Sequence, residues 1–366
     1  MHTYRYDLRF VTPAFLGNAN QQGQWRTPPI KALLRQWWRV AYMAERQFNA
    51  DAAASMRRKE AILFGHAWLE DDAVERKGRK QKVAARQSQV RLRLSHWNEG
   101  RLKTWDGLEQ GSIHHPEAEK ANYQVGPHAY LGYGPLDGRG GTKFAKKNNA
   151  AIQTNDSATL SLAVPDEHAN AIHTALALMN LYGTLGGRSR NGWGSFSLTP
   201  ADGNTPVLPN EFKETNVVQP WQDALRLDWP HAIGSDARGA LVWQTTAFDD
   251  WKKLMQELAR LKIALRTQFV LPHARPDGLV HDRHWLSYPI TNHSVKSWSG
   301  NARLPNSLRF KVRAAPGNPQ QLVGVIVHVP CLPPPAFQPD PRAIERVWQT
   351  VHAFLDAQSA LQRISA

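Results

Sequence analysis

Arg26-Thr-Pro-Pro-Ile-Lys-Ala-Leu-Leu-Arg-Gln-Trp-Trp-Arg39 is the stretch of the chain that says most about its fold. Pro28 and Pro29 end the segment before it, and Pro29 suits the first turn of a helix, where no N–H is needed. Apolar residues then recur at helical spacing, at Ile30, Leu33, Leu34, Trp37, Trp38, Ala41 and Tyr42. This pattern predicts an amphipathic helix over residues 29–48.

Cationic residues follow one edge of this helix. Lys31, Arg35 and Arg39 recur every four residues beside the apolar face, and Arg26 precedes the helix. We call these four residues the basic seam and expect it to bind the phosphates of a nucleic acid. The alternative is an ordinary core helix whose long cationic side chains are solvated at its rim.

A glycine-rich loop is the second informative stretch. This loop contains five glycines, two arginines and an asparagine, in the sequence Leu181-Tyr-Gly-Thr-Leu-Gly-Gly-Arg-Ser-Arg-Asn-Gly-Trp-Gly-Ser-Phe-Ser197. Glycine permits positive φ and a close approach to a ligand, and arginine binds phosphate in a bidentate manner. We expect contacts to nucleic acid from Gly186, Gly187, Arg188, Arg190, Asn191, Gly192, Trp193 and Gly194, with the ring of Trp193 stacked on a base. The alternative is a flexible turn.

These two stretches resemble the RAMP superfamily of CRISPR-associated RNA-binding proteins. The family's Thr-Pro turn, Gly/Ala loop, arginine and Leu-Arg-x-Trp-Trp-Arg helix correspond to Val11-Thr-Pro-Ala-Phe-Leu-Gly-Asn-Ala19, Arg26 and Leu34-Arg-Gln-Trp-Trp-Arg39. Glu60-Ala-Ile-Leu-Phe-Gly65, Tyr130-Leu-Gly-Tyr-Gly-Pro135 and residues 183–195 also look like family segments. The resemblance covers residues 1–200 and is weak beyond them. The Trp-Trp-Arg helix looks most like that of a subunit of the type III-B Cmr effector complex.

The resemblance implies both a fold and a function. The fold is α+β, with two ferredoxin-like (RRM-like) domains that have antiparallel sheets and inserted basic loops, over residues 1–200 and 210–366. The function is that of a non-catalytic RNA-binding subunit without a cofactor, because target cleavage in the Cmr complex is attributed to another subunit. Its partners would be crRNA, target RNA and other Cmr-type RAMP subunits. A RAMP-type endoribonuclease that processes CRISPR precursor RNA, and a basic nucleic-acid-binding protein outside CRISPR, remain alternatives.

The composition agrees with a polyanionic partner. Lys and Arg number 45 against 31 Asp and Glu, which gives a net charge of +14 and favours nucleic acid or an acidic membrane surface. The single Cys331 excludes an internal disulfide and a multi-cysteine zinc site. Apolar runs fall short of the roughly 20 residues of a membrane span. Met1-His-Thr-Tyr-Arg-Tyr-Asp7 has no signal-peptide core, so we expect a cytoplasmic protein that does not enter the membrane.

Other elements of the first half follow from local patterns. Alternation around Tyr4 to Phe10 predicts a strand over residues 3–11, and a second helix is expected over 56–69. Residues 76–103 carry ten Lys or Arg and one acid, and Arg91 and Arg93 alternate there with apolar residues. We expect a strand whose arginines contact phosphates, and a solvated charged loop is the alternative. A strand over 158–164, a helix over 166–181 capped by Asp166 and a strand over 195–198 complete the half.

Residues 200–209 are rich in Pro, Gly, Asn and Asp and are the expected domain boundary. A helix is predicted over 249–267, two strands over 308–314 and 322–329, and a terminal helix over 341–361. A second basic and aromatic patch is expected from Arg283, His284, Lys296, Trp298 and Arg303, with a polar surface loop as the alternative.

The sequence contains no strong motif for catalysis or metal binding. His281 and His284 have an unsupported metal-ligand spacing, and neither His-Glu-x-x-His nor Gly-x-Ser-x-Gly occurs. Residues 138–147 resemble a phosphate loop without its residue order, so we expect a basic flexible loop there. We therefore predict no metal site and no catalytic residue. A metal-independent ribonuclease would need a histidine or carboxylate at a 2′-hydroxyl, and isolated histidines leave that alternative open.

Overall fold

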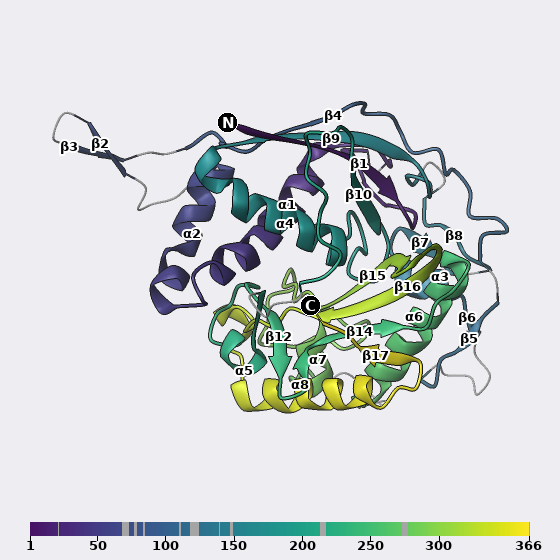
Figure 1. The fold of residues 1–366 in the computed structure, drawn as a ribbon. Helices are drawn as coiled ribbons and strands as arrows, with labels where there is room; N and C mark the ends of the chain where they lie inside the picture. Colours follow the sequence, from purple (N-terminus) through teal and green to yellow (C-terminus); the bar gives the residue numbers. More distant parts are fainter. Residues whose placement is uncertain are drawn as a thin grey trace.

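The computed structural model describes residues 1–20, 22–67, 73–76, 79–82, 85–109, 111–117, 124–138, 140–146, 149–212, 217–272 and 277–365 (Figure 1). The α-helices are α1 (Thr27–Ala44), α2 (Ala50–Phe64), α3 (Pro127–Gly132), α4 (Ala169–Tyr182), α5 (Trp221–Ala224), α6 (Trp251–Thr267), α7 (Asp282–Leu286) and α8 (Pro341–Asp356). Short 3-10 turns span Asp166–His168 and Pro335–Phe337. The described part of the chain is therefore a mixture of helices and strands.

Two four-stranded antiparallel sheets dominate the fold. The N-terminal sheet contains β1 (His2–Phe10), β4 (Arg91–Leu94), β9 (Ser157–Val164) and β10 (Phe196–Pro200); the C-terminal sheet contains β14 (Val242–Thr245), β15 (Leu308–Ala315), β16 (Asn318–His328) and β17 (Leu361–Arg363). A small sheet joins β11 (Val218–Pro220), β12 (Ile233–Asp236) and β13 (Gly239–Ala240). Three hairpins pair β2 (Ala73–Arg76) with β3 (Arg79–Lys82), β5 (Ile113–His114) with β6 (Gln124–Val125), and β7 (Leu136–Asp137) with β8 (Lys143–Phe144).

The N-terminal sheet follows from the alternating pattern of its strands. Tyr4, Tyr6 and Leu8 of β1 are buried, and the residues between them face outward. Figure 1 shows α1 and α4 on one face of this sheet. The order of strands across the sheet is β10-β1-β9-β4. The strand expected over residues 3–11 and the helix expected over 29–48 are confirmed, although α1 ends four residues early, at Ala44.

The two halves share one arrangement. In each, the four sheet strands and two long helices follow the order strand, helix, strand, strand, helix, strand along the chain, with α2 and shorter elements inserted. The C-terminal sheet has the order β15-β16-β14-β17. The strands of each sheet can be numbered from one to four in the order in which they occur along the chain. The N-terminal sheet then has the order 4-1-3-2. The C-terminal sheet has the same order when it is read from the edge formed by β17.

The C-terminal sheet is buried on both faces. Leu308, Phe310 and Val312 of β15 pack into the core with α6 and α8, so the alternate residues of β15 face the N-terminal half. Among these, Lys311 is fully buried and its Nζ donates to the carbonyl oxygens of Gly183 (2.7 Å) and Phe196 (2.5 Å). The interface between the two halves therefore contains a buried lysine that is hydrogen-bonded across it.

Two local expectations need correction. Asp166 does not cap α4, which begins only at Ala169, after a 3-10 turn; its carboxylate instead accepts a hydrogen bond of 2.8 Å from the amino terminus at Met1. β16 begins at Asn318, four residues before the strand expected over 322–329. Parts of the basic stretch 76–103, including residues 77–78 and 83–84, lie outside the described residues. No helix that the structure describes combines the length and apolar character needed to cross a bilayer.

Two buried histidines make the fold sensitive to acid. Burial lowers the pKa of His128 to about 4 and, chiefly by the same cause, that of His352 to about 4. Each folded-state pKa lies below the value of about 6.5 in an unfolded chain, so the unfolded state binds more protons at low pH. The contribution of these two neutral histidines to the free energy of unfolding is therefore complete above pH 6.5, and it is lost as the pH falls towards 4.

We expect each of these histidines to cost about 1 kcal/mol of unfolding free energy at pH 5.5 relative to pH 7.5. Urea unfolding at the two pH values measures this loss, and His352→Gln should reduce it by about 1 kcal/mol. Equal unfolding midpoints for the unsubstituted protein at both pH values would contradict the assignment.

Candidate nucleic-acid interface

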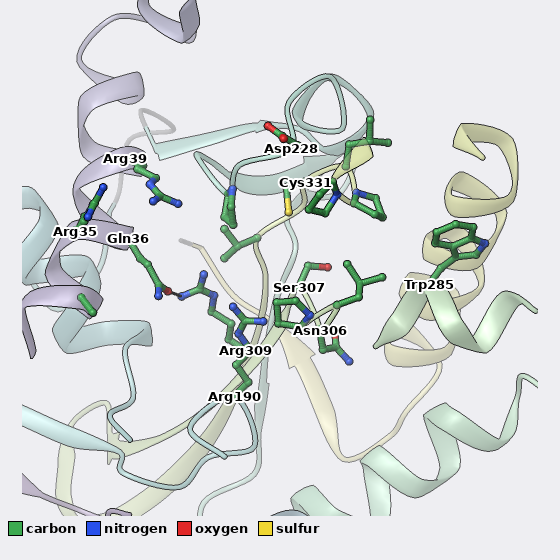
Figure 2. Close-up of a pocket in the computed structure, with 18 of the residues that line it drawn as sticks. Arg35, Gln36, Arg39, Arg190, Asp228, Trp285, Asn306, Ser307, Arg309 and Cys331 are labelled. Atoms are coloured by element: carbon green, nitrogen blue, oxygen red, sulfur yellow. Dashed lines mark hydrogen bonds between the residues drawn. The ribbon is translucent and has the colours of Figure 1, made fainter. Parts of the chain in front are cut away.

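The two stretches that the sequence singled out meet at one cavity. A cavity of about 670 Å³ lies between α1, the glycine-rich loop and the C-terminal half (Figure 2). The cationic side chains that line it are Lys31, Arg35, Arg39, Arg190 and Arg309. Asp228 is the one acidic residue among the described residues of its wall. We call this cavity the cationic pocket.

Two arginines of the basic seam are fixed by a carboxylate that the sequence did not single out. Glu60 of α2 is fully buried and accepts hydrogen bonds from Arg39 through Nε (2.5 Å) and Nη2 (3.0 Å), and another from Nε of Arg35. The guanidinium of Arg39 also lies 4.2 Å from the ring centroid of Trp229. One carboxylate thus holds two cations in place and leaves a net positive charge at the pocket wall.

The deeper cations have no such partner. Arg309 of β15 is only 6% exposed; its Nη1 donates to the side-chain oxygen of Gln36 (3.1 Å), and its Nε has no hydrogen-bond acceptor. Nη1 of Arg190 is likewise buried without an acceptor. Neither arginine forms an ion pair with any carboxylate that the structure describes. Figure 2 shows the two guanidiniums side by side at the base of the pocket.

The electrostatic cost of burying Arg190 and Arg309 together is reflected in their lowered pKa values. Burial, and then the neighbouring Arg190, lower the pKa of Arg309 to about 9. Burial also lowers the pKa of Arg190, and it raises that of the Cys331 thiol to about 11. Both guanidiniums stay protonated at neutral pH, with their charge confined to a poorly hydrated site. An anionic ligand with several oxygen acceptors would satisfy the free N–H groups and offset the charge.

Other residues of the basic seam differ in their surroundings. Burial, and then Arg35, lower the pKa of the half-buried Lys31, which lines the pocket. Arg26 does not line it: its Nη1 donates to the carbonyl of Gly17 (2.6 Å) and fixes the loop that precedes α1. The structure thus brings three of the four seam residues to the pocket and adds Arg309, which the sequence analysis assigned only to a strand.

The glycines of the loop have a structural reason to be there. Gly186, Gly192 and Gly194 have positive φ, which side-chain-bearing residues rarely adopt. A Cβ on Gly186 would lie 2.6 Å from the carbonyl oxygen of Phe15, and one on Gly194 would overlap that of Leu185. Gly187 donates its N–H to the same Phe15 oxygen (2.9 Å). The loop therefore packs closely on its own protein backbone.

Trp193 cannot take the role expected for it. Its indole is fully buried, and its ring centroid lies 5.4 Å from those of Phe15 and Trp105, and 5.5 Å from that of His128. The prediction that this ring stacks on a base is therefore wrong, because the ring is a core residue that joins the two halves. Asn191 is also used internally, since its Nδ2 donates to the carbonyl of Leu131 (2.7 Å).

Arg91 and Arg93 lie away from the pocket. Both are exposed on β4, the edge strand of the N-terminal sheet, on the face opposite to α1 and α4. Arg188 is exposed and has a positive φ of 55°, and it is not part of the pocket wall. The expected RNA-binding residues thus fall into separate places on the molecule.

The second basic and aromatic patch is not a surface patch. Arg283, His284 and Trp298 are buried, and Nη1 of Arg283 pairs with the carboxylate of Glu117 at 2.6 Å. Lys296 and Arg303 alone remain exposed. The expectation fails because Arg283 and His284 belong to the short helix α7, whose side chains are buried, and because the ring of Trp298 packs against Phe337 in the core.

Substitution of one glycine of the glycine-rich loop tests how closely this loop packs on the protein backbone. Gly194→Ala is expected to lower the unfolding free energy by about 2 kcal/mol, because φ is +66° there and the new Cβ would overlap the Leu185 carbonyl. Gly203→Ala is the matched control, since a Cβ at that position would meet nothing within 4 Å. Urea unfolding compares the two, and equal stability for both variants would show that the loop can open without cost.

Comparisons with known proteins give the following. The model of the RAMP superfamily matches residues 7–197, slightly more than half of the chain. Cmr1 from Pyrococcus furiosus, in its apo form, is similar at 16% identity over 90% of this chain and 88% of that one, with a TM-score of 0.41. A chain of the type III-B Cmr-beta complex bound to cognate target RNA is similar at 12% identity over 95% and 99%, with a TM-score of 0.43. No protein of curated function matches the chain.

Proposed function

The chain belongs to the RAMP superfamily, and from this we propose that it is a non-catalytic RNA-binding subunit of a type III-B, Cmr-type CRISPR effector ribonucleoprotein in antiviral defence. The observation that carries the RNA-binding part is the cationic pocket. It places Lys31, Arg190 and Arg309 around one cavity without a matching number of acids. The type of complex rests on the resemblance of the Trp-Trp-Arg helix.

The pocket suits the backbone of a single strand of RNA. Its volume of about 670 Å³ admits a nucleotide-sized group, and its free guanidinium N–H groups fit phosphate oxygens. A single strand can enter a pocket between α1 and the C-terminal half, whereas a duplex presents its phosphates only on a broad convex surface. In the proposed complex the bound strands are crRNA and target RNA, and other Cmr-type subunits complete the site.

We propose further that each half is a ferredoxin-like domain, the first over residues 1–200 and the second over 210–366. The common strand order of the two sheets supports this, as does their common alternation of strands and helices. The cytoplasm is the expected compartment, because the RNA partners are there.

The surroundings of the histidines favour binding over cleavage. None of the described residues that line the cationic pocket is a histidine. His128 is the histidine that packs on Trp193 of the glycine-rich loop, and it is 1% exposed and neutral. One connection supports the endoribonuclease alternative: Oγ of Ser307, a pocket residue, lies 3.0 Å from Nε2 of the buried His328. That pair would be the first place to look for a general base.

One assay separates the two functions. The purified protein is mixed with one labelled single-stranded RNA at two salt concentrations, with and without a divalent metal. We expect salt-sensitive binding and intact RNA. Cleavage at one position that is lost in His328→Gln would support the endoribonuclease instead. Absence of binding at low salt would overturn the proposal for the isolated chain.

A further inference from the structure

A second cluster of cations lies beyond the cationic pocket, on the other arginine of the glycine-rich loop. Arg188 lies against Gly134, where a Cβ would be 3.3 Å from its Nη2. Burial lowers the pKa values of Arg188 and, more strongly, of Lys262 on α6, and the nearby charge of Arg266, also on α6, lowers both further. The side-chain oxygen of Asn191 accepts a hydrogen bond from Nζ of Lys262. We call Arg188, Lys262 and Arg266 the loop cluster.

The loop cluster lacks compensating charge. None of its three cations forms an ion pair with a carboxylate in the described residues, and the acceptors that they do have, Asn191 and the hydroxyl of Tyr130 (3.4 Å from Nη1 of Arg266), are neutral. The Nε of Arg266 is buried without any acceptor. Structural cations on the same helix look different, since Arg260 is bonded to Glu257 through Nε (2.9 Å) and Nη2 (2.6 Å).

An exposed aromatic ring adjoins these charges. Tyr133 follows α3 and is 60% exposed, which is unusual for so large a side chain, and it is near enough to Arg188 to affect its pKa. Gly134 comes next and leaves the space that the Arg188 guanidinium occupies. A ring with a free face beside unpaired guanidiniums is the arrangement that binds a nucleotide by stacking its base and pairing its phosphate.

We propose that the loop cluster binds a phosphate group of single-stranded RNA and that the Tyr133 ring stacks on the adjoining base. The inference rests on the RNA-binding function proposed above and adds a second contact point to it. Arg188 and Arg190 are two residues apart in the loop, so a strand held in the cationic pocket has only the loop to cross before it reaches this cluster. An acidic segment of a partner protein is the competing ligand.

The test uses the full chain and fluorescence anisotropy with a labelled single-stranded RNA. Arg188→Asn keeps the backbone, because asparagine tolerates positive φ, and Arg266→Gln removes the second accessible charge. We expect this double variant to lower affinity about tenfold and to reduce the slope of log affinity against log salt by about 1.4, or 0.7 for each lost phosphate contact. Arg260→Gln, on the same helix, is the matched control and should change the affinity less than twofold.

Tyr133→Ala tests the stacking independently, and its exposed position makes misfolding a minor concern. We expect a fivefold to tenfold loss of affinity with no change in salt slope, and no loss on an RNA that is abasic throughout. Unchanged affinity in both the double variant and Tyr133→Ala would overturn the inference. Tighter binding of a poly-glutamate peptide than of poly-uridine, abolished in the double variant, would overturn it in favour of an acidic protein segment.

The two proposals fail in different ways. If the unsubstituted protein binds no RNA, the proposed function fails. If it binds RNA and only variants of the cationic pocket, such as Lys31→Gln with Arg190→Gln, weaken the binding, then the proposed function stands and the loop cluster has no part in it.

Discussion

Glu60→Gln is expected to lower the free energy of unfolding by about 3 to 5 kcal/mol, the cost of removing one partner from a buried ion pair. The carboxylate is fully buried and is the shared acceptor of Arg35 and Arg39. Without its charge, the guanidinium of Arg39, which is only 17% exposed, keeps a charge that water compensates only in part. A single polar-for-polar exchange of equal size should therefore destabilise the protein severely.

Urea unfolding at neutral pH measures this cost. Glu257→Gln is a matched control, because Glu257 pairs with the half-exposed Arg260 at the surface and its loss should cost less than about 1 kcal/mol. A loss below 1 kcal/mol for Glu60→Gln would mean that water compensates the charge of Arg39 as well as that of Arg35, whose side chain is already 39% exposed. The account of Glu60 as the residue that fixes the basic seam would then be wrong.

Arg309→Met is expected to stabilise the fold and weaken RNA binding at the same time. The buried guanidinium lacks a carboxylate, and its pKa of about 9 reports the cost of keeping the charge there. Methionine fills a similar volume without that charge, so we expect a gain of about 2 kcal/mol in the free energy of unfolding. The same exchange removes one of the N–H groups offered to a phosphate, and we expect about tenfold weaker RNA binding.

The opposite signs of these two effects make the prediction specific. If Arg309 served only for packing, its substitution would destabilise the protein and would leave the RNA affinity of the folded protein unchanged. Urea unfolding and anisotropy on the same preparation distinguish the cases. Destabilisation by Arg309→Met with unaltered affinity would show that Arg309 is structural.

The sequence predicted the two stretches of the pocket because each has a local signature. Helical spacing of apolar residues located α1, and clustered glycines located the loop. The sheet order and the pairing of Glu60 with two arginines depend on contacts distant along the chain, and no spacing rule reports those. Glu60 lay in a predicted helix and in a segment that resembles the family, and neither observation indicates that its carboxylate pairs with two arginines.

Burial at the contact between the two halves explains why the prediction for Trp193 was wrong. Trp193 and the alternate residues of β15 lie at the contact between the two halves, which buries surfaces that a single half would expose. A pattern such as Arg309, Lys311 and Arg313 is typical of a solvent-facing strand edge, yet here it faces the N-terminal half. A local sequence pattern shows which residues share one face of a strand, and it does not show which part of the protein covers that face.

The salt dependence of RNA affinity tests the central claim, that the cationic pocket binds single-stranded RNA. The variant is Lys31→Gln with Arg190→Gln; the control is Arg342→Gln with Arg346→Gln, which removes the same charge from the exposed side of α8, outside the pocket wall. We expect the slope of log affinity against log salt to fall by about 1.4 in the pocket variant and by less than about 0.3 in the control. Equal changes in both would mean that RNA responds only to net charge, and the claim would be contradicted.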